Sequence, residues 1–108
     1  MISIEQQFAE KIHAYTLPRV QRPNSRVKYF VDMQLLIGIR TFDLHKLRVD
    51  LRKVFKFRNT HSLPIHIPSP PIEWVEPYAE LAEKCGIESN LILAFQNVSE
   101  FYSNIGDV

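Results

Sequence analysis

With 108 residues, of which 45% are hydrophobic, the chain can bury one modest core and is too short for two ordinary domains. No apolar run approaches the roughly 20 residues of a membrane span, and the first residues lack the basic-then-apolar form of a secretion signal. The single cysteine, Cys85, excludes an intrachain disulfide, and we expect it to pack inside the fold before Gly86. These features predict a cytoplasmic protein that does not enter a membrane.

The net charge of +1 conceals two oppositely charged parts. Residues 11–58 contain twelve Lys/Arg and three Asp, a balance of +9, whereas the rest contains one Lys and nine Asp/Glu, a balance of −8. Two interpretations stay open. Either the charges are solvated and the two parts attract each other, or the basic part meets a polyanion such as RNA or a nucleotide.

Helical spacing of apolar residues predicts a first helix over residues 4–16, opened by a capping box at Ser3. After a basic turn, Asn24 or Ser25 is expected to cap a second helix that runs to about Ile37. Its apolar residues lie nearly all round it. Such a helix is typically central and buried.

A third helix is expected from a cap at Thr41 or Asp43 to about Phe57, with Phe55 and Phe57 in the core. The proline-rich residues 59–71 predict an extended connection, pinned by its own leucine and isoleucines. The pinning residues would be Leu63, Ile65 and Ile67.

A fourth helix is expected to begin near Pro77, with Trp74 in the turn before it, and to end at Gly86. Residues 88–105 predict a fifth helix. Residues 1–108 are therefore expected to form one all-α bundle of about five helices, with the proline-rich connection between the third and the fourth.

Lys11 interrupts the apolar stripe of the first helix. Burying an ammonium group costs several kcal/mol unless it meets an anion, so this position indicates an ion pair or a ligand. One interpretation is a buried salt bridge from Asp32, which we expect to be at least half-buried, to Lys28 or Lys11. The other is a phosphate site, in which Lys11, Arg26 and Lys28 gather at the N-terminus of the second helix.

Three stretches of the chain resemble the C-terminal region of AbiEii/AbiGii-type nucleotidyltransferase toxins. They are Phe8-Ala9-Glu10-Lys11-Ile12-His13-Ala14, Asn24-Ser25-Arg26-Val27-Lys28-Tyr29-Phe30-Val31-Asp32-Met33 and Trp74-Val75-Glu76-Pro77-Tyr78-Ala79-Glu80-Leu81.

The resemblance implies a toxin of a toxin–antitoxin pair or a phage-defence system, with an antitoxin as partner and tRNA or another RNA as acceptor. It also implies Mg²⁺-dependent nucleotide transfer by an α/β core followed by a helical bundle. Lys11 corresponds to the family's active-site lysine, and Asp32 to its second acidic residue, so both are the expected catalytic residues. Tyr29 stands where members usually have an aspartate, and a phenol does not replace a carboxylate as base or metal ligand.

The family's Gly-rich turn and Asp-x-Asp pair do not occur in this chain. Without that pair the transferred nucleotide has no metal clamp, so we expect the chain alone to be inactive. It would be a fragment, a truncated product, or a module that meets a core in another chain. Mg²⁺ and a nucleoside triphosphate would then bind only with that core, and this chain itself would hold no cofactor.

A second candidate surface lies on the third helix, where four basic residues recur at spacings of three and four. They are His45, Arg48, Arg52 and Lys56. Such a stripe can follow a phosphate backbone, which makes an autonomous RNA-binding or protein-interaction module the alternative function.

We expect no metal site, because the histidines do not converge and His13 points away from the apolar stripe. A homo-oligomer is expected, since a bundle without its neighbouring core would expose apolar surface.

Overall fold

A computed structural model describes residues 3–17, 26–39, 41–59 and 61–105, which form five α-helices and a short 3₁₀ helix, with no strand among them. The prediction of an all-α fold is confirmed. The elements are α1 (Ile4–Thr16), α2 (Val27–Ile39), α3 (Leu44–Arg58), the 3₁₀ helix η2 (Ile72–Trp74), α4 (Val75–Cys85) and α5 (Leu91–Asn104).

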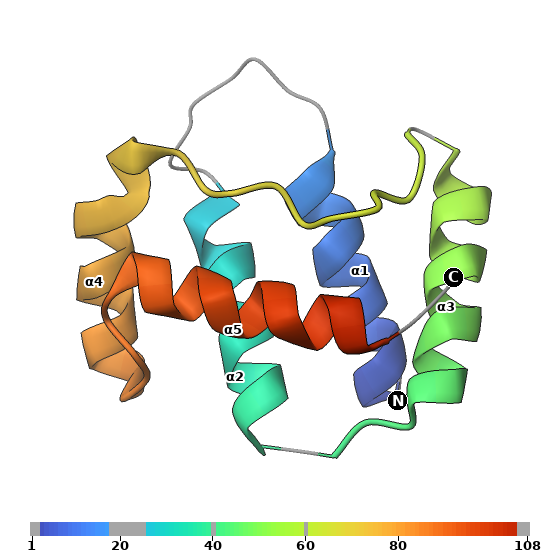
Figure 1. Cartoon of the computed structure of the whole chain (residues 1–108), viewed down its shortest axis with the longest axis horizontal. Helices are drawn as coiled ribbons and strands as arrows, with labels where there is room; N and C mark the ends of the chain where they lie inside the picture. The colour runs from blue at the N-terminus through green and yellow to red at the C-terminus, as the bar shows by residue number, and fades with distance from the viewer. Residues whose placement is uncertain (1–2, 18–25, 40, 60, 106–108) are drawn as a thin grey trace.

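Four helices stand side by side in the order α4, α2, α1, α3, and α5 crosses in front of them (Figure 1). In this row α1 and α2 run in opposite directions, whereas α4 runs parallel to α2 and α3 runs parallel to α1 (Figure 1). The central position predicted for the second helix is confirmed, since α2 packs against α1, α4 and α5. As a result α3 and α4 lie at opposite edges of the molecule.

Side-chain caps set where the helices begin. The side-chain oxygens of Ser3, Asp43 and Asn90 each accept a hydrogen bond from a backbone N–H two or three residues later. Of the two caps proposed for the third helix, Asp43 is the correct one. The fifth helix begins at Leu91 rather than at Glu88, because the Asn90 cap fixes its start. The caps proposed at Asn24 and Ser25 lie outside the described residues.

Left-handed residues end two helices. Asn59 has φ 49° after α3, and Gly86 has φ 70° after α4, so both helices stop where the sequence predicts. Pro77 lies in the first turn of α4, where its missing N–H costs no hydrogen bond. By contrast α2 continues through Gly38 to Ile39, two residues beyond its predicted end.

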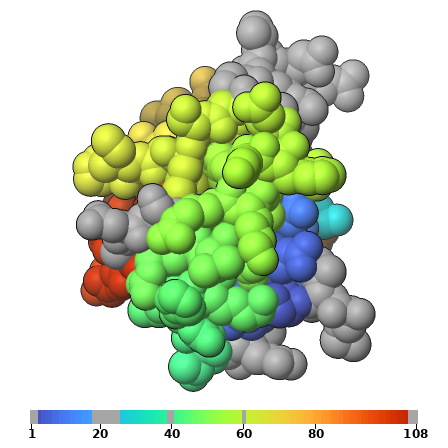
Figure 2. All heavy atoms as spheres, turned by 90° about the vertical axis from the view of Figure 1, so that its right-hand side faces the viewer, coloured from blue at the N-terminus to red at the C-terminus, as the bar shows by residue number. Residues whose placement is uncertain are grey.

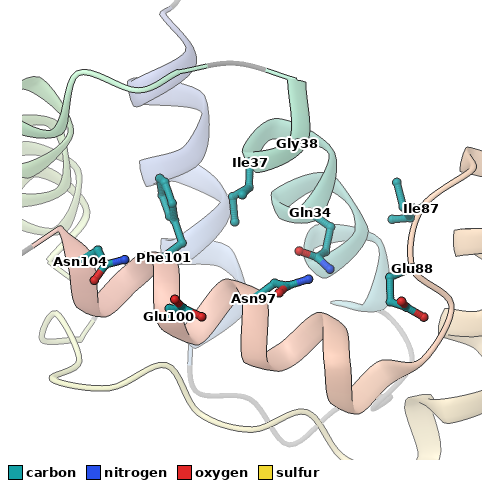
Figure 3. Close-up of a pocket in the computed structure, with 9 residues that line it drawn as sticks. All are labelled: Gln34, Ile37, Gly38, Ile87, Glu88, Asn97, Glu100, Phe101 and Asn104. Atoms are coloured by element: carbon teal, nitrogen blue, oxygen red, sulfur yellow. The ribbon is translucent and has the colours of Figure 1, made fainter.

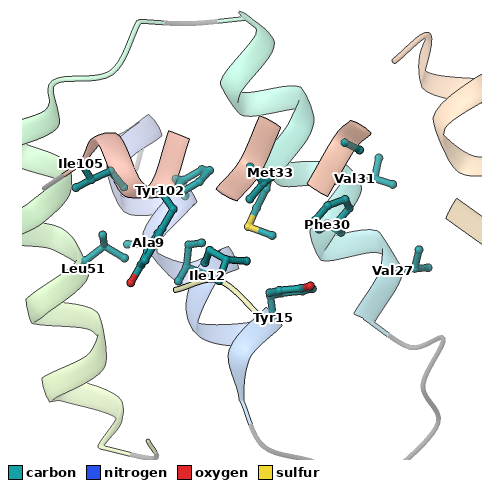
Figure 4. Close-up of a cluster of buried hydrophobic side chains, with 14 of the residues drawn as sticks. Ala9, Ile12, Tyr15, Val27, Phe30, Val31, Met33, Leu51, Tyr102 and Ile105 are labelled. Carbon is teal, nitrogen blue, oxygen red and sulfur yellow. The ribbon is translucent and has the colours of Figure 1, made fainter. Parts of the chain in front are cut away.

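The core is one cluster between the row of helices and α5 (Figure 4). Its largest fully buried side chains include Phe8, Phe30, Met33 and Tyr78. Three apolar predictions are wrong: Cys85 is exposed at the end of α4, Phe57 is 87% exposed, and Ile65 is 86% exposed. Cys85 and Phe57 lie in the last turn of a helix and Ile65 lies in the Pro-rich connection, where helical periodicity does not decide which side chain meets the core.

Two tyrosine hydroxyls hold the Pro-rich connection (residues 59–71) against the bundle. Tyr15 Oη donates to the carbonyl oxygen of Pro68 at 2.7 Å, and Tyr102 Oη donates to that of Pro64 at 2.5 Å. Ile67 is 4% exposed and joins the core, as predicted. Among the described residues no helix has the length and apolar character that a membrane crossing requires.

Candidate functional site

Lys11 and Asp32 form an ion pair between α1 and α2. Lys11 Nζ lies 2.9 Å from a carboxylate oxygen of Asp32, and the two side chains are 32% and 26% exposed. The prediction that Asp32 is at least half-buried and paired is confirmed, with Lys11 as the partner, while Lys28 is exposed. The Lys11 side chain is partly buried rather than enclosed in the core, since about a third of it is exposed.

The aromatic ring of Tyr29 borders this ion pair. Lys11 Nζ lies 5.4 Å from the ring centroid, within the range of a cation–π contact. Tyr29 stands where the family resemblance implies an aspartate, and here it contributes an aromatic face. The ammonium group is therefore held by one carboxylate and one ring.

A surface cavity of about 350 Å³ opens beside Lys11. It is lined by Glu10, Lys11, His13, Ala14, Leu17, Tyr29 and Arg58. Arg58 reaches it from the end of α3 and is paired with Glu10, with N–O distances of 2.9 and 3.0 Å. Sequence reasoning missed Arg58, since only the packing of α3 on α1 brings it to this place.

Arg26 is directed at the C-terminal end of α1. Its guanidinium group donates to the backbone carbonyl oxygen of Leu17 and, at 3.4 Å, to that of Tyr15. A cation here complements the negative end of the α1 dipole. Of the three predicted phosphate residues, only Lys11 lines the cavity.

Two histidines meet at the end of α1. His13 is 6% exposed, and its ring centroid lies 4.8 Å from that of His61 and 5.2 Å from that of Phe55. The predictions that His13 points away from the apolar stripe and that the histidines do not converge are wrong for this pair. They meet because the Pro-rich connection folds back along α1, where His61 Nε2 lies 2.8 Å from Thr16 Oγ1.

The surroundings of these histidines favour their neutral forms. Burial, together with the nearby His61 and Arg58, lowers the pKa of His13, and Glu10 acts in the opposite direction. Burial and the charge of Arg26 lower the pKa of His61. Both imidazoles are therefore mainly neutral at pH 7.

The residues around Lys11 do not fit the Mg²⁺ that the family resemblance implies. Asp32 and Glu10 are the carboxylates nearby, and each is already paired with a cation. In the described part of the chain no three His, Cys, Asp or Glu residues gather as a metal site. We therefore assign no metal-dependent step to this chain by itself.

The basic stripe of α3 lies along one open face of the molecule (Figure 2). His45, Arg52 and Lys56 are exposed there. Arg48 is half-buried, and its guanidinium donates at 2.5 Å to the carbonyl oxygen of Ile105. Arg48 thus joins α3 to the end of α5, whereas the other three residues are available to a partner.

A larger cavity of about 510 Å³ lies between α2 and α5 (Figure 3). Figure 3 shows carboxamide and carboxylate groups around it, together with the apolar side chains of Ile37 and Phe101. Its lining residues are Gln34, Ile37, Gly38, Ile87, Glu88, Asn97, Glu100, Phe101 and Asn104. Because this lining contains no Lys or Arg, the cavity does not suit a phosphate.

The fold and the site together define a small helical bundle with a lysine-lined cavity between α1, α2 and α3. The family model described as the nucleotidyl transferase AbiEii toxin of type IV toxin–antitoxin systems matches residues 1–90. The match covers most of the chain, so the chain belongs to this family. Neither a curated protein nor a solved structure matches it.

Proposed function

We propose that this chain is the C-terminal helical portion of an AbiEii-like nucleotidyltransferase toxin and that Lys11 binds a nucleotide phosphate. The observation that carries the proposal is the placement of the Lys11 ammonium, 2.9 Å from Asp32, at a cavity of about 350 Å³. Membership of the family supports a nucleotidyltransferase-type role.

Two cations border the cavity, each paired with one carboxylate, and each has more hydrogen-bond donors than that carboxylate occupies. An ammonium group has three donors, so Lys11 has donors beyond the one that faces Asp32. Arg58 brings a second cation to the same cavity. Asp32 thus orients Lys11, and a phosphate would bind between Lys11 and Arg58.

We further propose that transfer chemistry requires a catalytic core on another segment or another chain. Asp32 would act at the reacting phosphate only in that assembly, with Mg²⁺ and the nucleoside triphosphate held mainly by the core. Because the family is a toxin family of type IV toxin–antitoxin systems, an antitoxin is the expected functional partner.

Calorimetric titration of the chain with each of the four nucleoside triphosphates tests the phosphate site. Loss of a hydrogen bond to a charged group costs about 1.5–3 kcal/mol, so Lys11→Ala should weaken binding by roughly 10- to 100-fold. Lys84→Ala, which removes an exposed lysine from α4, is the matched control and should bind like the unmodified chain. Equal affinity of Lys11→Ala and the control would reject the proposal.

A second candidate function is RNA binding along α3, favoured by the exposed row His45, Arg52 and Lys56. Reversing Arg52 and Lys56 to Glu should abolish binding of a labelled tRNA, while Lys11→Ala should leave it unchanged. Arg48 is left intact in this test, because it supports the carbonyl of Ile105. Unchanged RNA affinity after the double reversal would exclude α3 as the RNA surface.

A further inference from the structure

The C-terminal end of α3 carries an exposed aromatic side chain among basic ones. Phe57 is 87% exposed, and Lys53 lies one turn before it on the same helix face. Lys56 and Arg58 flank it in sequence, and all three basic residues are exposed. An isolated exposed Phe is common, but one framed by like charges has the composition of an interaction surface.

Phe57 also forms part of a groove between α1 and α3. The groove has a volume of about 490 Å³ and is lined by Gln6, Glu10, Lys46, Asp50, Lys53, Val54, Phe57 and Arg58. Lys46 pairs with Asp50 at 3.2 Å, and Arg58 pairs with Glu10 at 2.9 Å. These internal pairs neutralise part of the lining, so Lys53 and the neighbouring Lys56 give the groove its positive rim.

The corner formed by η2 and the start of α4 has the opposite charge. Ile72 is 81% exposed and Val75 is 48% exposed, and the exposed Glu73 and Glu76 alternate with them along the chain. Trp74 between them is only 3% exposed and fixes the corner to the core. Ile72 and Val75 are thus exposed to solvent, while the buried Trp74 fixes the backbone between them.

We propose that the chain binds a second copy of itself head to tail, with Ile72 and Val75 of one copy in the α1–α3 groove of the next. Glu73 and Glu76 would then face Lys53 and Lys56. Each patch has an apolar centre inside a charged rim, and the two rims have opposite signs, which is the complementarity of a specific contact. This contact goes beyond the proposed nucleotide site and involves none of the residues that bind phosphate there, except Arg58 at the border.

The geometry decides the kind of assembly. The end of α3 and the start of α4 lie at opposite sides of the molecule (Figure 1), so one molecule cannot join its own two patches. When the groove of one copy binds the η2–α4 corner of another, each dimer still has one free groove and one free corner. The assembly therefore extends into open chains of molecules or closes into rings.

Sedimentation velocity of the nuclease-treated chain over a wide concentration range tests this proposal. We expect the average mass to rise above the monomer with concentration and to fall with added salt, since the rims are exposed charges. Phe57→Ser changes an exposed side chain and should weaken association about tenfold or more.

Charge reversal gives a sharper test. K53E/K56E makes both patches negative and E73K/E76K makes both positive, so each variant alone should stay monomeric. Mixed in equal amounts, they should assemble again, because each then offers the other a complementary patch. The control E83K/E100K has the same change in net charge as E73K/E76K, at exposed positions outside the two patches, and should assemble normally.

Several outcomes would overturn the proposal. A strictly monomeric parent chain would do so, as would mixing that fails to restore assembly. An assembly that is present before nuclease treatment and absent after it would show that the basic end of α3 binds RNA rather than a second copy.

Discussion

At the scale of single residues, the Lys11–Asp32 pair is better suited to placing a charge than to stabilising the fold. Both side chains are about a quarter to a third exposed, and ion pairs in such surroundings contribute about 0–1 kcal/mol. The value of the pair is therefore the fixed position of an ammonium group beside the cavity.

The substitution Asp32→Asn tests whether Asp32 acts by orienting Lys11 or by its negative charge. The amide oxygen can still accept from Lys11, while the negative charge that competes with a phosphate is removed. We expect nucleotide affinity to rise several-fold and the free energy of unfolding to fall by less than about 1 kcal/mol. Calorimetric titration and urea unfolding measure the two effects, and an affinity loss as large as that of Lys11→Ala would contradict this view.

The neighbouring His13 and His61 make the stability of the fold depend on pH. In the folded chain the pKa values of His13 and His61 lie below their ordinary value of 6.5, so the unfolded chain binds more protons as the pH falls. The stabilising effect of neutral histidines is complete above pH 6.5 and is lost as the pH falls through and below it.

Urea unfolding at several pH values from about 7.5 to about 5 should show this decline. His13→Phe keeps a ring against Phe55, 5.2 Å away in the parent, and removes one titrating group. Its stability should therefore depend less on pH than that of the parent. A decline just as steep in His13→Phe would point to other titrating groups.

At the scale of helices, the sequence predicts a helix boundary correctly wherever a nearby residue sets that boundary. The Ser3 and Asp43 caps and the left-handed Gly86 mark boundaries that the sequence predicts, because each acts within a few residues. The Arg58–Glu10 pair and the His13–His61 contact were not predictable in this way. They depend on α3 and the Pro-rich connection returning to α1, which spacing along one helix does not encode.

The candidate site divides in the same way. Lys11 and Asp32 stood out because each breaks an apolar helical pattern, and they do meet. Arg26 and Lys28 were predicted beside them from a helix-terminus argument, yet Arg26 is directed at backbone carbonyls instead. A long basic side chain reaches several acceptors, and its choice is decided by three-dimensional packing.

The tyrosine hydroxyls should determine how firmly the Pro-rich connection is held. Burial raises the pKa of Tyr102 to about 12, so its hydroxyl remains a donor to Pro64 at physiological pH. Tyr102→Phe should cost about 1 kcal/mol of unfolding free energy and speed cleavage of the connection by protease.

Tyr29→Phe is the control, because Tyr29 lies away from the connection and keeps its ring face toward Lys11. Equal protease sensitivity of the two variants would show that the Tyr102 hydroxyl does not hold the connection.

Gly38 lowers the stability of α2, because glycine is a poor helix former. A Cβ added there meets no atom within 4 Å, and the residue lies in the last turn of the helix. Gly38→Ala should therefore raise the free energy of unfolding by up to about 0.5 kcal/mol, as measured by urea unfolding, because the full gain of about 0.5–1 kcal/mol applies to helix interiors. A loss of stability would show that the open side of α2 is needed by another part of the chain.

At the scale of the whole molecule, the most basic helix and the most acidic region lie at opposite edges. The basic α3 and the acidic η2–α4 region lie on either side of a structure whose longest extent is 34 Å (Figure 1). Exposed charges are screened over about 8 Å at physiological salt, so these two groups hardly attract each other within one molecule. The exposed charges of α3 and of the η2–α4 region therefore act mainly on other molecules that approach these edges.

The course of the Pro-rich connection implies that the protein should tolerate being made as two pieces. The rings of Tyr15 and Trp74, 5.8 Å apart, and those of Phe30 and Tyr78, 5.5 Å apart, join the part before the connection to the part after it. A chain divided between the exposed Ile65 and His66 would still possess these contacts. When the two pieces are produced separately and mixed, they should associate and regain the helical circular dichroism signal. Folding of the bundle could then be started by mixing the pieces.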